Sequence, residues 1–109
     1  MSEVTNLILT FQCAEDEAAR IEDVNSFEYR GLKMNVVSAD FDKDMEKGYS
    51  WYGGTKFLET ALYIGAFNHF PLEQFIEHLK KIKWDEPENV QLFVKEQFDF
   101  KFRLIELES

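Results

Sequence analysis

Three alternating aspartates are the first residues whose type and spacing could do chemistry. Asp40, Asp42 and Asp44 resemble the start of a calcium loop, because calcium needs several oxygen ligands from one short segment. An EF-hand loop beginning at Asp40 would require glycine and glutamate where the chain has Met45 and Trp51, so the sharp turn and the bidentate ligand are missing. We therefore predict no metal site there and interpret the segment as a solvated acidic loop or as contacts for a basic partner.

A second group of candidate ligands and acid–base groups lies around the second predicted helix. His69 precedes that helix, and Glu73 and Glu77 follow on one of its faces, one turn apart. His78 lies about 100° round the helix from Glu77, so the group is not the paired histidines of a zinc protease. Two interpretations stay open: a locally bonded loop histidine beside an exposed helix face, or a small enzyme or metal-dependent protein with a pocket near His69, Glu73 and the Gly53-Gly54 loop.

Signatures of the common enzyme classes are missing from the sequence. It has no Gly-x-Ser-x-Gly, no phosphate-binding glycine loop with lysine and no Gly-x-Gly-x-x-Gly. The single Cys13 excludes an internal disulfide and a multi-cysteine zinc site, as suits a reducing compartment. There is also no secretory signal and no apolar run of membrane-spanning length. We predict a cytoplasmic protein without cofactor that is not an enzyme.

Charge is distributed unevenly along the chain. Residues 1–46 carry eleven Asp and Glu against four Lys and Arg, whereas residues 47–109 carry ten against eight. The electric field of this acidic chain attracts a basic partner and repels nucleic acid and anionic membranes. We therefore expect neither nucleic acid nor a membrane as a partner. The predicted partner-binding acids are Glu15, Asp16, Glu17, Glu22 and Asp23, which a first helix should point outward, together with Asp40, Asp42 and Asp44.

Aromatic residues between glycines form the other candidate contact site. Trp51 and Tyr52 lie in the glycine-flanked stretch 48–54. Large amphipathic rings are frequent at the energetic centres of protein interfaces, so both residues are predicted to bind the partner. The alternative is that they fold back over the sheet as a lid.

Hydrophobic periodicity predicts the elements that must position these residues. Alternation indicates strands over residues 4–12, 32–38, 58–67, 90–96 and 100–107, and a 3.6-residue period indicates helices over 14–24 and 71–82. Residues 39–56 lack either period and are predicted to be a long loop. We therefore predict one α+β domain over 1–109. It should have a mostly antiparallel five-stranded sheet and two helices in the order βαββαββ, a ferredoxin-like variant with an added edge strand.

Three stretches carry a resemblance to known proteins. Residues 51–56, 65–69 and 84–92 resemble those of small, mostly uncharacterised bacterial proteins, and acidic chains of this length resemble immunity proteins that neutralise a cognate toxin. The resemblance implies inhibition by tight binding. Independently, an acidic surface can mimic a phosphate backbone and occlude a basic, nuclease-like cleft. We also consider a homodimer formed through the exposed edge of the terminal hairpin.

Overall fold

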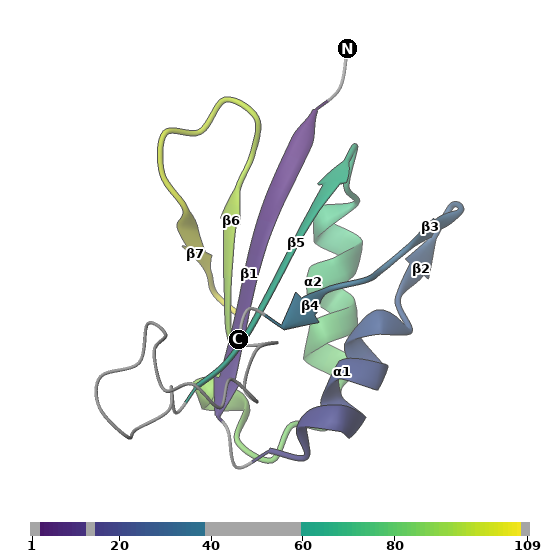
Figure 1. Ribbon diagram of the computed structural model, residues 1–109, viewed down its shortest axis with the longest axis vertical. Coiled ribbons are helices and arrows are strands. Elements are labelled where there is room, and N and C mark those ends of the chain that lie inside the picture. The colour runs from purple at the N-terminus through teal and green to yellow at the C-terminus, as the bar shows by residue number, and fades with distance from the viewer. Residues whose placement is uncertain (1–2, 13–14, 39–59, 108–109) are drawn as a thin grey trace, which may run out of the picture.

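The computed structural model describes residues 3–12, 15–38 and 60–107 and contains one main sheet with helices on one side of it (Figure 1). The sheet is antiparallel throughout, in the order β4-β5-β1-β6-β7. Its strands are β1 (Val4–Gln12), β4 (Val37–Ser38), β5 (Thr60–Asn68), β6 (Gln91–Lys95) and β7 (Arg103–Ile105). The remaining elements are α1 (Glu17–Asn25), β2 (Glu28–Tyr29), β3 (Leu32–Lys33), α2 (Leu72–Lys81) and the 3₁₀ turn η1 (Pro87–Asn89). The predicted α+β class, the five-stranded sheet and the helix positions are confirmed.

The segment 32–38 is not the single strand that the sequence predicts. Its first part, β3, pairs with β2 in a separate two-stranded hairpin, and its last part, β4, joins the main sheet beside β5. Between them, the Met34 amide donates to the Phe27 carbonyl (3.0 Å) and the Val36 amide donates to Oδ1 of Asn25 (2.9 Å). These donors bond to the last residue of α1 and to Phe27 just after it, and the segment passes from pairing with β2 to pairing with β5.

The core lies between the sheet and the two helices. On β1, Leu7, Leu9 and Phe11 point into it, as the alternation predicts, and each is nearly inaccessible to solvent. From α2, Phe75 and Leu79 meet them and are completely buried, which confirms the predicted apolar stripe of that helix. Burying such side chains is the main favourable term in folding.

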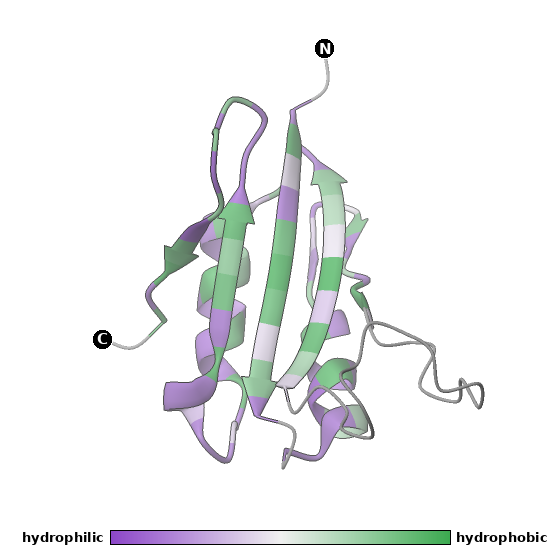
Figure 2. Cartoon of the chain, turned by 60° about the vertical axis from the view of Figure 1, so that its left-hand side comes forward, coloured by the Kyte–Doolittle hydropathy of each residue, from purple (hydrophilic) through white to green (hydrophobic). Residues whose placement is uncertain are grey.

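The opposite face of the sheet is also rich in apolar residues, and we call it the open face. Cross-strand register aligns one apolar residue from each strand, because directly opposed residues of an antiparallel pair point to the same side. The row runs across the whole sheet through Val37, Ile64, Ile8, Phe93 and Leu104. Figure 2 looks onto this face, where hydrophobic segments of β6, β1 and β5 lie side by side in front of the helices.

The connection between β6 and β7 is longer than the three residues, 97–99, that separate the predicted strands 90–96 and 100–107. β6 ends at Lys95 and β7 begins at Arg103, so residues 96–102 form the connection. It is closed by the Asp99 amide donating to the Glu96 carbonyl (3.0 Å) and by ion pairs from Arg103 to Glu96 and Asp99. As a result Phe98, at 80 % exposure, and Phe100, at 97 %, lie outside the paired strands.

Candidate functional site

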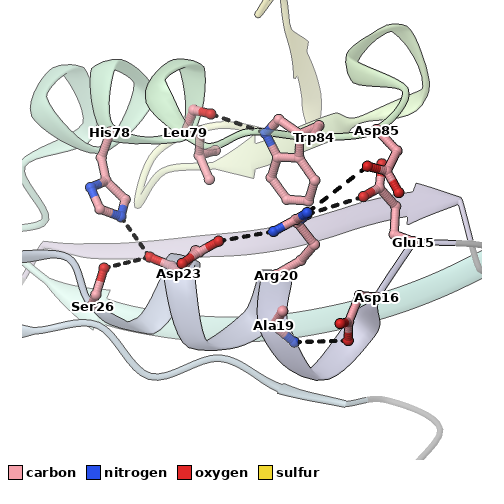
Figure 3. Close-up of polar contacts among 10 residues, drawn as sticks. All are labelled: Glu15, Asp16, Ala19, Arg20, Asp23, Ser26, His78, Leu79, Trp84 and Asp85. Atoms are coloured by element: carbon pink, nitrogen blue, oxygen red, sulfur yellow. Dashed lines mark hydrogen bonds and ion pairs between the residues drawn. The ribbon is translucent and has the colours of Figure 1, made fainter.

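Glu15 is a buried carboxylate at the junction between β1 and α1 (Figure 3). Its side chain is only 1 % exposed. One oxygen accepts from Nε of Arg20 (3.1 Å), and the other accepts from the backbone amide of Glu86 (2.9 Å). The prediction that Glu15 points outward is therefore wrong: the carboxylate joins α1 to the segment after α2, and a partner could not touch it.

The surroundings of Glu15 keep it ionised. Burial alone would raise its pKa, because a charged group loses hydration. Hydrogen bonds from the backbone amides of Glu86 and Asp85 and from the Arg20 guanidinium outweigh that effect, and the pKa of Glu15 lies below its ordinary value of 4.5. The carboxylate is thus a charged structural anchor in the folded protein.

Arg20 is shared among several carboxylates. Besides Glu15, its guanidinium contacts Asp23 at 3.1 Å and approaches Asp85 at 4.0 Å. The side chains of Asp23 and Asp85 remain 46 % and 67 % exposed, whereas that of Arg20 is only 17 % exposed. One cation therefore meets three anions, and the excess negative charge faces solvent.

The other acids of α1 have different surroundings. Asp16 is the N-cap: its Oδ1 accepts from the Ala19 amide (3.3 Å), while its side chain stays at the surface. Glu17 accepts a hydrogen bond from the hydroxyl of Tyr63 on β5. Burial and this carboxylate both raise the pKa of Tyr63, so the phenol stays protonated. Glu22 is exposed, as predicted.

The segment after α2 supplies acids that sequence reasoning missed. Trp84 packs on Phe11 with ring centroids 5.2 Å apart, and its indole Nε1 donates to the Leu79 carbonyl (3.0 Å). This fixes the position of Asp85 and Glu86 beside Arg20 and Glu15. The sequence Asp85-Glu86-Pro87 indicates only a helix breaker. A long-range contact was needed to bring its charges to α1.

We call this group of carboxylates, together with Arg20, the acidic pole. Figure 3 shows α1 and the segment after α2 meeting there around the Arg20 side chain. The acidic pole comprises Glu15, Asp16, Glu17, Asp23, Asp85 and Glu86, together with Arg20.

His78 holds the same region together from α2. Its Nε2 lies 2.8 Å from the Asp23 carbonyl oxygen and donates to it, because a carbonyl can only accept. The ring also packs against Phe27, with centroids 5.3 Å apart. His78 therefore links α2 to the C-terminal turn of α1. This bond holds in place the part of the α1 backbone that carries Asp23.

His69 and Glu73, which the alternative prediction places at one pocket, do not both line the hollow beside His69. His69 is exposed, has φ +50° and donates its backbone amide to the Glu3 carbonyl (2.9 Å). It borders a hollow of about 290 Å³ together with Glu96 and Asp99, but Glu73 does not line that hollow. In the described ranges, no group of three or more His, Cys, Asp or Glu side chains could hold a metal ion.

Several predicted site residues lie outside the described residues. These are the loop acids Asp40, Asp42 and Asp44, the aromatic pair Trp51 and Tyr52, and the Gly53-Gly54 stretch. Their roles stay predictions.

Comparison with protein-family models, curated protein sequences and solved structures finds no match to this chain. Neither α1 nor α2 is long and apolar enough to cross a bilayer, and the same holds for every helical stretch within residues 3–12, 15–38 and 60–107.

Proposed function

We propose that this chain is a non-enzymatic binding protein that engages a basic protein partner through the acidic pole. The observation that carries the proposal is the charge imbalance around Arg20: three carboxylates meet one guanidinium, and two of the three are about half or more exposed. A basic side chain of a partner would meet Asp23 and Asp85 at the surface.

The hydrogen bonds and ion pairs within the acidic pole support its use as a binding surface. Arg20 and the backbone hold the carboxylates in place before a partner arrives, so less side-chain freedom is lost on binding. The field of a chain with net charge −9 also speeds the encounter with a cationic protein and weakens as salt is added.

We further propose that binding inhibits the partner, as an immunity protein inhibits its toxin. A rigid acidic surface can cover a basic cleft that binds phosphate, and so neutralise a toxin or nuclease by occlusion. We propose this role in the cytoplasm, where a single cysteine is compatible with a reducing environment.

The charge component is tested with a labelled oligolysine peptide and two variants of equal charge. Asp23→Asn/Asp85→Asn removes two charges at the pole, and Glu73→Gln/Glu77→Gln removes two from the exposed face of α2. We expect the first variant to weaken peptide binding about fivefold more than the second, with a shallower salt dependence. Equal losses in both variants would contradict a specific acidic pole.

The inhibitory component needs the native partner. A photo-crosslinking residue at position 85, introduced in cells that carry the chain, should capture a basic protein, and the same residue at position 73 should not. The activity of the captured protein is then measured with and without equimolar wild-type chain. Loss of activity supports an inhibitor, and unchanged activity contradicts it.

A further inference from the structure

Most of the exposed large apolar side chains of the described residues lie on the open face. There are six, and Val37, Ile64 and Leu104 belong to the apolar row of the open face by register. Phe102 borders a shallow hollow on that face, and Phe98 and Phe100 lie in the same β6–β7 connection. Large contiguous apolar patches are rare on monomeric proteins and mark interaction sites.

The open face also differs from the rest of the chain in charge. The sequence contains 21 Asp and Glu, yet register places none of them among the open-face positions of β1, β4, β5, β6 and β7. Lys95, opposite Asn6, is the one charged residue among those strand positions. Two copies with net charge −9 would repel each other least if they met through this face.

A hollow on this face is lined by a residue that is close along the chain to a protruding side chain. The hollow, of about 440 Å³, is lined by Asn6, Ile8, Val37, Ile64, Ala66 and Phe102. Phe100, at 97 % exposure, is two residues from Phe102, so their Cα atoms are at most about 7 Å apart. A two-fold interface uses the same patch on both subunits and therefore needs both features side by side.

We propose that the open face binds a second copy of this chain, with Phe100 of each copy seated in the hollow of the other. The two sheets then pack face to face, about 10 Å apart, as the layers of a β-sandwich do. The acidic pole lies on the helix side of the sheet and stays accessible in this dimer.

The available area is sufficient for a specific dimer. The 28 residues of the five strands, each covering about 3.3 Å by 4.8 Å, offer roughly 440 Å² of sheet. Burying Phe100 adds at least about 150 Å² per copy. The total, roughly 1,200 Å² for two copies, reaches the lower bound of specific interfaces.

Sedimentation velocity from low micromolar to near-millimolar concentration tests the dimer. Wild-type chain should show a concentration-dependent monomer–dimer equilibrium. Phe100→Asp should raise the dissociation constant about 100-fold, because it places a charge in an apolar pocket. Ala66→Asp, on the wall of the hollow, should act similarly, while Gln74→Asp on exposed α2 should leave the equilibrium unchanged. Matching thermal melts of the monomers will show that the variants fold.

Disulfide trapping tests the proposed contact directly. In a Cys13→Ser background, a Phe100→Cys chain mixed with an Ala66→Cys chain should form the mixed disulfide faster than Gln74→Cys mixed with Ala66→Cys. Three results would overturn the proposal: a strict monomer at the highest concentration, a dimer that survives both Asp variants because it uses the β7 edge, or mixed disulfides at equal rates.

Discussion

The acidic pole and the open face differ in the side chains that they expose. The pole exposes carboxylates held by internal bonds, and the open face exposes apolar residues. At the pole, Glu15 is buried and bonded, and Asp23 and Asp85 share Arg20. On the open face, apolar side chains from five strands align without a helix of the described residues packed over them. The charges at the pole thus stabilise the fold and are proposed to bind a partner, while the open face leaves apolar surface exposed.

The two faces of the sheet should differ most in their effect on stability. Leu9 faces the helices at 1 % exposure, and Ile64 faces the open side at 41 %. We expect Leu9→Ala to lower the free energy of unfolding by about 3 kcal/mol through lost burial and a cavity. Ile64→Thr should cost about 0.5 kcal/mol, since it removes little buried area. Urea denaturation at low protein concentration measures both, and similar losses would contradict the assignment of the two faces.

The buried carboxylate of the pole should matter more than an exposed one. Glu15→Gln keeps the shape but weakens the bonds to Arg20 and to the Glu86 amide, so we expect a loss of about 2 kcal/mol. Glu22→Gln, on the exposed side of α1, serves as the control and should change stability by less than about 0.5 kcal/mol. A Glu15 variant as stable as the control would show that the anchor is unimportant.

The stability of the fold at low pH should also report on Glu15, because protonation of this carboxylate is linked to unfolding. The pKa of Glu15 is lower in the folded protein than its ordinary value of 4.5. Its ionisation therefore stabilises the fold fully above that value, and the contribution is lost as the pH falls through the folded-state pKa. Denaturation series between neutral pH and pH 3 should show a smaller decline in Glu15→Gln than in wild type. Parallel declines would mean that Glu15 titrates normally.

The helix cap of the pole should give the smallest of these effects. Asp16→Ala removes the acceptor for the Ala19 amide and should cost about 1 kcal/mol. Asp16→Asn retains a capping oxygen and should recover most of that loss. Thermal melts followed by circular dichroism distinguish the two, and an asparagine variant as unstable as the alanine variant would contradict a capping role.

Hydrophobic periodicity predicted those helices and strands whose buried face it identifies. The alternation of Leu7, Leu9 and Phe11 and the stripe containing Phe75 and Leu79 indicated the core, since each pattern reports which face is buried. The fold class followed from the order of these elements.

Long-range contacts account for what the sequence did not predict. Glu15 has the polarity of a surface residue, and its partner amide at Glu86 is 71 positions away. The alternating phenylalanines after β6 are typical of a strand, yet pairing resumes only at Arg103, so Phe100 is exposed. Periodicity describes neighbours along the chain and carries no information on which distant segment completes a site.

Residue-level NMR during titration with unlabelled oligolysine tests the central claim most directly, because it reports on both regions at once. We predict that amide shifts concentrate at Asp16, Asp23, Asp85 and Glu86, diminish with added salt, and leave Val37, Ile64 and Leu104 unchanged. Shifts spread evenly over the exposed acids, or centred on the open face, would contradict the claim that the acidic pole is the surface for a basic partner.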